Sequence, residues 1–142
     1  MTTTAAPTVP EVDFLGSRAR VHAGDDAIGL VDVVSPAGDM APLHVHQTHD
    51  EGFFVLEGVV TLYLPGRAIT LRPGQFMLAP RGVPHTYRID EGPARKIVTS
   101  TPAGFERFVA EVGSTGVTDP ATLAEVAARY DIEILGPPGM LP

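Results

Sequence analysis

The sequence predicts an all-β domain, a closed or sandwich-like antiparallel barrel that ends in a helical cap. The 142 residues include 15 Gly and 14 Pro without a repeat period, which favours many short elements joined by tight turns. Short segments that suit strands follow one another from Phe14 to about Arg95. After residue 101 the apolar spacing becomes that of helices.

We expect eight to ten short strands, each ended by Gly or Pro. The segment at 52–66 reads as a hairpin-like pair with its kink at Gly58. The expected strand segments are RARVHA (18–23), AIGLVDVV (27–34), LHVH (43–46), GFFVLEGVVTLYLPG (52–66), RAITLRPG (67–74), QFMLAPRGVP (75–84), HTYRID (85–90) and RKIVTSTP (95–102).

One or two helices should follow the strands. GFERFVAEVG (104–113) has apolar residues at helical spacing, and Thr118 or Asp119 can cap a second helix whose first turn holds Pro120. The closing GPPGMLP reads as an extended, proline-stiffened tail. The expected division is therefore a flexible N-terminal arm at 1–12, the barrel at 13–101, and C-terminal helices with an extended tail at 102–142.

Composition narrows the classes of partner and location. Seventeen acidic residues against 10 basic ones give a net charge of −7, which disfavours nucleic acid and anionic membranes. The absence of cysteine excludes disulfides and thiolate metal sites. The first residues have neither a basic nor an apolar targeting region, and no apolar run is long enough to span a bilayer, so we expect a cytoplasmic location.

Three of the five histidines lie within six residues, at 44–49. On a strand His44 and His46 point to the same face, about 7 Å apart. A short turn would bring Glu51 back towards them, and His85 begins a later strand after a turn. Three imidazoles and a carboxylate suit Fe(II), Mn, Co, Ni, Cu or Zn without choosing among them. Taken singly, a histidine in a strand is more often a surface or core residue than a ligand.

The spacing of these residues is more specific than their identity. Two patterns occur, Gly38-x5-His44-x-His46-x4-Glu51-x6-Gly58 and Gly74-x5-Pro80-x-Gly82-x2-His85, separated by fifteen residues. Both match the two motifs of the cupin superfamily, which the chain resembles over about residues 30–100.

The resemblance implies an antiparallel jelly-roll (cupin) β-barrel, usually dimeric, with one divalent transition metal ion per chain. It implies that His44, His46, Glu51 and His85 are the metal ligands. One position departs from the family, because the second motif usually ends in Asn and here has Ile89. That residue is not a ligand in the family, so the change makes the barrel lining more apolar and leaves metal binding intact.

The chain also looks like the small single-domain bacterial cupins named quercetin 2,3-dioxygenase-like. This resemblance implies a metal-dependent dioxygenase that cleaves a small aromatic or enol substrate, with Glu51 both as ligand and as the base that takes a substrate proton. From the strand alternation we expect a substrate-binding lining formed by Phe53, Val55, Leu62, Met77, Tyr87 and Ile89.

Other interpretations stay open at this point. The protein could instead be a non-catalytic small-molecule-binding or sensor cupin, or a non-redox metal-dependent isomerase or lyase. We expect His49 in the turn at the barrel mouth, although it could compete as a ligand. Asp50 reads as an exposed turn residue or as a group that orients a ligand histidine. Phe54 and Leu56 lie opposite the ligand face, which favours a homodimer.

Overall fold

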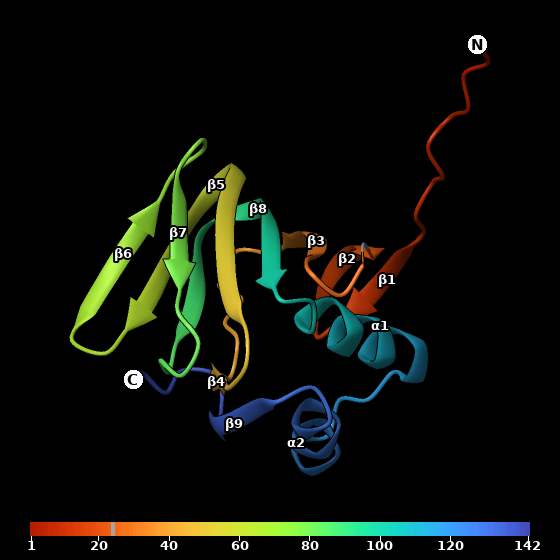
Figure 1. Cartoon of the computed structure of the whole chain (residues 1–142). Coiled ribbons are helices and arrows are strands. Elements are labelled where there is room, and N and C mark those ends of the chain that lie inside the picture. Colours follow the sequence, from red (N-terminus) through yellow and green to blue (C-terminus); the bar gives the residue numbers. More distant parts are fainter. Residues whose placement is uncertain (24) are drawn as a thin grey trace.

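The computed structural model describes residues 1–23 and 25–142, which form nine strands and two helices (Figure 1). About half of the described chain is in strands and far less is in helices, which confirms the predicted all-β class with a helical extension. The elements are β1 (Glu11–Phe14), β2 (Ser17–Ala23), β3 (Gly29–Ser35), β4 (Leu43–His46), β5 (Asp50–Leu64), β6 (Arg67–Leu71), β7 (Phe76–Ala79), β8 (Thr86–Thr101), α1 (Phe105–Thr115), α2 (Pro120–Ala128) and β9 (Ile132–Gly136).

The strands form two antiparallel sheets of unequal size. The larger has the order β1-β2-β3-β8-β5-β6, with β7 also paired to β5, and the smaller consists of β4 and β9. Isolated bridges join His44 to His85 and Met40 to Arg88, so β4 and the chain just before it lie beside the start of β8. The sheets thereby close around a common interior as a jelly-roll barrel.

The predicted hairpin at 52–66 is wrong, because β5 runs through it without reversing. β5 pairs with β8 from Asp50 opposite Thr101 to Tyr63 opposite Thr86, and the register shifts between Val55 and Val60. Gly58 lies in this irregular stretch with φ 79°, and a Cβ there would meet the Glu91 carbonyl oxygen at 2.5 Å. The kink predicted at Gly58 is therefore a bulge within one long strand.

One core joins the barrel to the C-terminal helices. It includes inward-facing residues of β3, β5 and β8 together with Phe108, Val109 and Val112 of α1 and the apolar stripe of α2. Phe14 of β1 packs edge-to-face against Phe108, with ring centroids 5.8 Å apart. The helices are thus fixed against the N-terminal strands by apolar burial. None of the described helices combines the length and apolar character needed to cross a membrane.

Both ends of the chain differ in detail from the sequence prediction. β1 begins at Glu11, inside the segment expected to be an arm, and residues 1–10 extend away from the body without regular structure (Figure 1). The second helix starts as predicted, with the Asp119 side chain accepting from the Thr122 N–H at 3.0 Å. Beyond it, Asp131 takes a positive φ of 58° and the chain forms β9, where helices and an extended tail were expected.

Candidate metal centre

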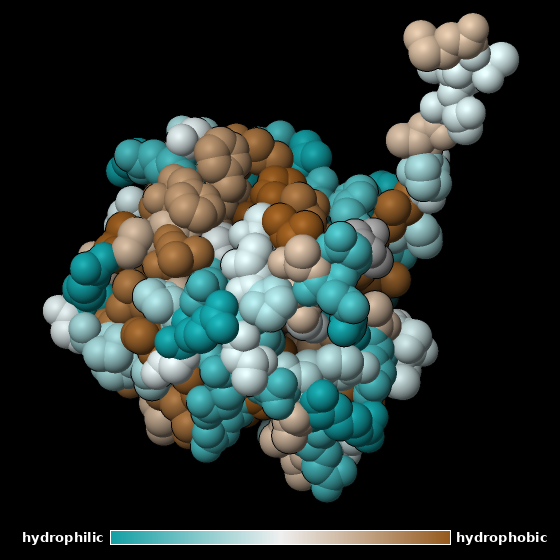
Figure 2. All heavy atoms as spheres, in the orientation of Figure 1, coloured by the Kyte–Doolittle hydropathy of each residue, from teal (hydrophilic) through white to brown (hydrophobic). Residues whose placement is uncertain are grey.

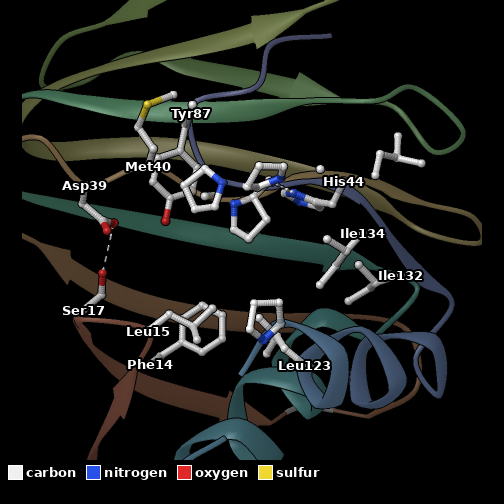
Figure 3. A pocket seen from close by; sticks show the side chains of 18 of the residues that line it. Phe14, Leu15, Ser17, Asp39, Met40, His44, Tyr87, Leu123, Ile132 and Ile134 are labelled. Carbon is white, nitrogen blue, oxygen red and sulfur yellow. Dashed lines mark hydrogen bonds between the residues drawn. The ribbon is translucent and has the colours of Figure 1, made fainter. Parts of the chain in front are cut away.

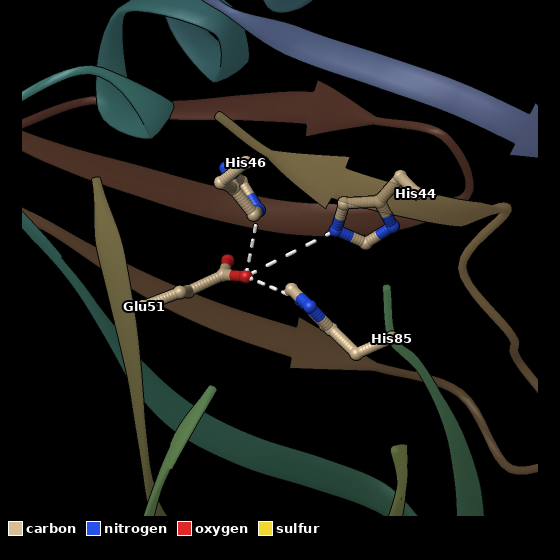
Figure 4. A group of neighbouring side chains, drawn as sticks. All are labelled: His44, His46, Glu51 and His85. Atoms are coloured by element: carbon tan, nitrogen blue, oxygen red, sulfur yellow. Dashed lines mark hydrogen bonds and ion pairs between the residues drawn. The ribbon is translucent and has the colours of Figure 1, made fainter. Parts of the chain in front are cut away.

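The four predicted ligands come together at one point of the barrel interior (Figure 4). β4 carries His44 and His46, Glu51 is the second residue of β5, and His85 lies just before β8. Their ligand atoms all lie within 4.8 Å of one another. The backbone bridge between His44 and His85 fixes the two motifs side by side, with N–H to carbonyl distances of 3.1 and 2.9 Å.

One carboxylate oxygen lies at the centre of the group. Glu51 Oε2 is 2.7 Å from His85 Nε2, 2.8 Å from His46 Nε2 and 3.9 Å from His44 Nε2. His46, Glu51 and His85 are buried, whereas His44 is half-buried and borders a cavity. The group is therefore buried except where His44 and Glu51 border the cavity, and a ligand would reach it from there.

Local hydrogen bonds set the orientation of two imidazoles. His44 Nδ1 donates to the Pro42 carbonyl oxygen at 2.7 Å, and His85 Nδ1 donates to the Val83 carbonyl oxygen at 3.3 Å. Each acceptor lies two residues before its histidine. With the proton on Nδ1, His44 presents the lone pair of Nε2 to the centre, which is the tautomer a metal ligand needs. His85 Nε2 lies at hydrogen-bond distance from Glu51 Oε2, 2.7 Å, and a bound metal would replace the proton between them while Nδ1 donates to Val83.

His46 provides the test of whether a metal fits. Its Nδ1 lies 2.7 Å from His49 Nε2, while its buried Nε2 has no hydrogen-bond partner among the described residues. The Glu51 oxygen near that nitrogen does not meet hydrogen-bond geometry despite the short distance. A buried nitrogen without a partner is costly, and a cation between it and Glu51 would satisfy both.

The charge states of the group also suit a metal. Burial opposes the charged form of Glu51, but the three histidines outweigh it and hold the pKa of its carboxyl well below its usual range. Burial lowers the pKa of His85, against the pull of Glu51. At neutral pH the carboxylate is therefore charged and His85 neutral, as coordination requires.

These observations agree with a metal-binding role. Ligand atoms around one ion with bonds of about 2.0–2.2 Å lie up to roughly 4.4 Å apart, close to the span seen here. Three nitrogens and one carboxylate form a shell that suits several divalent transition metals and leaves the identity of the metal open. The four residues His44, His46, Glu51 and His85 could hold such an ion.

His49 lies in the turn between β4 and β5, as predicted, but its side chain is buried against His46. It is 2% exposed, and it is the hydrogen-bond partner that orients His46. Burial, followed by the neighbouring His46, lowers the pKa of His49 to about 4, so the ring is neutral at pH 7 and its Nε2 can accept from His46 Nδ1. Gly104 lies against this ring, and a Cβ there would come within 3.0 Å of it.

Asp50 has a different partner from the one considered. It accepts from the Arg81 backbone N–H at 2.9 Å and from Arg81 Nε at 3.2 Å, and it bonds no histidine among the described residues. The orienting role proposed for Asp50 thus belongs to His49.

A cavity of about 860 Å³ opens beside His44 and Glu51 (Figure 3). The barrel contributes Phe53 and Tyr87 to its wall, and the N-terminal strands contribute Phe14 and Ser17. Leu15 and the loop at 38–42 before β4 also line it. The rest of the wall comes from the C-terminal part of the chain, with Phe105, Phe108, Thr118, Pro120, Leu123, Ile132, Ile134 and the tail from Leu135 to Gly139. The cavity therefore lies between the barrel and its C-terminal extension, and most of its wall is apolar.

Two of the six residues predicted to line a substrate site border this cavity. Phe53 and Tyr87 line the cavity, whereas Val55, Leu62 and Ile89 are buried in the core and Met77 packs against that core. Val55, Leu62 and Ile89 face inward as expected, but they fill the packed core and do not border the cavity. The aromatic residues of the C-terminal wall were missed, since their periodicity indicated a core face of a helix and gave no sign of a cavity.

Sequence reasoning also missed a buried charge. Lys96 is 1% exposed and occupies an inward position of β8, between Ala94 and Val98. Burial lowers the pKa of its amino group to about 8. The signal was present, because a lysine replaces an apolar residue on the inward face of an alternating strand.

Comparisons with known proteins agree with this fold and site. The cupin domain family matches residues 31–99. Quercetin 2,3-dioxygenase of Bacillus subtilis is 34% identical over 84 residues, which cover 59% of this chain and 25% of the relative. The chain thus spans about a quarter of the length of that curated relative.

Solved structures show the same fold at lower identity. KdgF from Halomonas sp. has a TM-score of 0.64 at 23% identity, covering 69% of this chain and 92% of that one. An RmlC-like cupin from Shewanella frigidimarina has a TM-score of 0.61 at 22% identity, covering 67% and 85%. With both motifs present and the family match across the barrel, the chain belongs to the cupin superfamily, as one of its small members.

Proposed function

We propose that this protein is a metal-dependent dioxygenase of the quercetinase-like type, which oxidatively cleaves a small aromatic or enol substrate. The observation that carries the proposal is the position of the histidine–glutamate group at the inner side of a largely apolar cavity. The likeness to quercetin 2,3-dioxygenase of Bacillus subtilis supports the same reaction class. A divalent metal at His44, His46, Glu51 and His85 would supply the redox centre where substrate and O₂ meet.

The cavity wall suits a flat aromatic body. Phe14, Phe105 and Phe108 form a cluster in which Phe14 meets the other two edge-on, with ring centroids 6.0 and 5.8 Å away. Phe53 also lines the cavity, and its ring centroid lies 6.0 Å from that of His85. No lysine or arginine is among the described lining residues, so a phosphorylated or otherwise anionic substrate is disfavoured.

Glu51 has a second role in this proposal. Its carboxylate is buried and ionised, and it borders the cavity. A hydroxyl group that enters beside His44 would therefore meet a base already in its charged form, hydrogen-bonded to His85. Exclusion of water around the group strengthens the attraction between Glu51 and that proton.

Substrate-dependent O₂ uptake tests the proposal. Protein loaded separately with Fe, Mn, Co, Ni, Cu or Zn is mixed with the flavonol quercetin, and O₂ consumption is followed at an electrode. At least one of the redox-active metals is expected to give about one O₂ consumed per substrate lost. The variant His44→Ala/His46→Ala provides the background rate of spontaneous oxidation.

Two other results would point to the alternative functions. Tight binding without O₂ uptake under any metal would favour a sensor or binding protein. Turnover of a small carbonyl compound under anaerobic conditions, with Zn or Mn bound, would favour an isomerase or lyase. Either result contradicts the dioxygenase proposal.

We also propose that the protein acts as a homodimer through the outer face of β5 and β7. Phe54, Leu56, Phe76 and Leu78 are 36–56% exposed on this face. Phe54 and Phe76 are direct cross-strand partners. Apolar side chains gather over the upper part of these strands in Figure 2. A patch of this kind on a small domain favours association with a second copy.

Sedimentation equilibrium tests the dimer. Wild-type protein is expected at twice the chain mass, and Phe54→Glu/Phe76→Glu at the chain mass, with Arg67→Glu on the exposed β6 as the control that stays dimeric. A wild-type protein that sediments as a monomer at all concentrations would contradict the proposal.

A further inference from the structure

A buried ammonium group lies in the barrel interior, apart from the four candidate ligands. Lys96 Nζ donates to Ser35 Oγ at 3.1 Å and lies 4.3 Å from the centre of the Tyr87 ring. Among the described residues, no carboxylate lies within ion-pair distance of it. Burying a cation with one hydroxyl and one aromatic face is costly, and an apolar side chain would fit the core at lower cost. The position of Lys96 therefore calls for a role beyond packing.

A chain of hydrogen bonds leads from Lys96 to the cavity. Ser35 Oγ lies 2.7 Å from Ser17 Oγ, and Ser17 donates to Asp39 Oδ2 over a longer 3.4 Å. An ammonium can only donate and a carboxylate can only accept. The direction is therefore fixed, because Ser35 accepts from Lys96 and donates to Ser17, which in turn donates to Asp39.

The two ends of this chain differ in their access to the cavity. Ser17 and Asp39 are among the lining residues, whereas Ser35 and Lys96 lie behind them and are buried. In Figure 3, Asp39 and Ser17 lie on one side of the cavity and His44 lies on the other. Only one Asp39 oxygen, Oδ2, is bonded to a described side chain, and the other remains available to a ligand.

Asp39 and the histidine group border the same cavity, because Asp39, His44 and Glu51 are all among its lining residues. Tyr87 lies on the wall between them, and burial, followed by the charges of Asp39 and Glu51, raises its pKa. The charges of Asp39 and Glu51 also both act on Lys96. One ligand can therefore contact Glu51 with one group and Asp39 with another.

We propose that Asp39 and Ser17 form a hydroxyl-binding subsite, and that Lys96, through Ser35, is the positioning residue that holds the Asp39 carboxylate in place. The inference rests on the proposed function and sharpens its substrate class. The substrate is an aromatic or enol compound with a second hydroxyl, remote from the oxygen that lies beside Glu51. An acceptor such as Asp39 selects a neutral donor and rejects an anionic group at that position.

Binding of matched probes tests this subsite without turnover. Zinc-loaded protein is titrated anaerobically with the parent flavonol and with flavonols that carry one additional phenolic hydroxyl remote from the enol-ketone group. At least one hydroxylated flavonol should bind the wild type about tenfold more tightly than the parent, the size expected for a hydrogen bond to a charged group. The ratio of the two dissociation constants is the readout, because general damage to the cavity affects both probes alike.

The variants separate the two residues of the subsite from the residues behind them. Asp39→Ala and Ser17→Ala should bring the ratio to about one, and Lys96→Met and Ser35→Ala should reduce it at least about threefold. Asp13→Ala removes an exposed carboxylate of β1 with a side chain 87% exposed, and should leave the ratio unchanged. If Lys96→Met does not fold, Ser35→Ala alone breaks the same chain.

Each remaining outcome overturns a defined part of the proposal. A wild-type ratio near one, or a ratio unchanged in Asp39→Ala, removes the subsite and leaves the proposed function standing. A ratio lost in Asp39→Ala but unchanged in both Lys96→Met and Ser35→Ala removes the role of Lys96. Failure of every flavonol to bind protein with normal zinc content removes the aromatic enol substrate, and the subsite with it.

Discussion

The cavity has two polar regions that are built in different ways. At the histidine group, two of the three rings are oriented by a carbonyl two residues earlier in the chain, Pro42 for His44 and Val83 for His85. At the Asp39 subsite, the side chains come from β2, β3, the loop before β4, and β8, and each depends on the next across strands. The first region is specified by short motifs, whereas the second exists only in the folded barrel.

This difference has an energetic side. Removing a ligand from the histidine group leaves other buried polar atoms unsatisfied. Removing the charge of Lys96 instead relieves the core of a buried cation. The histidine group should therefore lose most of its metal affinity when one member changes. Replacing the lysine should instead raise the free energy of unfolding and lower only the binding selectivity.

The largest effect is expected when two ligands are removed together. His44→Ala/His46→Ala should abolish metal retention while the barrel still folds, because the two remaining ligands cannot hold an ion through dialysis. Metal content is measured after purification without a metal-affinity tag, and folding by circular dichroism. His22→Ala, which changes an exposed histidine of β2, is the control. Unchanged metal content in the double variant would show the ligand assignment to be wrong.

The next effect concerns the partner that orients His46. His49→Ala should weaken metal binding about 10–100-fold, since an orienting group behind a ligand typically has this influence. Competition with a chromophoric chelator measures the affinity. An affinity within twofold of wild type would mean that His46 is held by its packing alone.

The same residue gives a pH dependence to the metal-free protein. The pKa of His49 is lowered to about 4 in the folded chain, mainly by burial, and is near 6.5 in the unfolded chain. Between these values the unfolded state binds the proton, so the free energy of unfolding falls as pH drops from 6.5 to 4, by up to about 3 kcal/mol. Urea unfolding in the presence of a chelator at pH 7 and pH 4.5 measures the loss, which should be smaller in His49→Gln.

Lys96 should give a pH dependence of the same sign on the alkaline side. Its pKa is lowered by burial to about 8, against about 10.5 when unfolded, so unfolding becomes harder as pH rises through that window. Lys96→Met removes the buried charge and should be about 1–3 kcal/mol more stable than wild type at pH 7, with the difference shrinking by pH 10. Denaturant midpoints at both pH values test this. If the variant were less stable than wild type by more than about 1 kcal/mol, Lys96 would contribute to the stability of the core, contrary to this prediction.

The smallest effect is expected at the mouth of the barrel. Asp50→Asn breaks an exposed pair with Arg81, so the free energy of unfolding should change by no more than about 0.5 kcal/mol. Metal affinity should stay within twofold of wild type. A larger change in metal affinity would mean that Asp50 also helps to orient the ligand histidines.

Much of the fold was predictable because its signals are local. The helix cap at Asp119 and the strands at 18–23, 27–34 and 43–46 follow from short patterns of capping and burial. The joining of 52–66 into one strand was not predictable, since Gly58 suits a hairpin and a bulge equally well and only the pairing with β8 decides between them. The strand at Ile132–Gly136 depends likewise on an available edge of β4.

By itself the sequence predicted which four side chains converge, because the two motifs that carry His44, His46, Glu51 and His85 match those of the cupin superfamily. Only the tertiary structure decided that His49 turns inward onto His46, that the C-terminal segment closes the cavity, and that Lys96 reaches Asp39 through two serines. The physical reason is that the ligand group is tied to fixed residue types at fixed spacings, which can be read from the chain. The other three features depend on how the turn after β4, the C-terminal segment and β8 pack against the rest of the barrel.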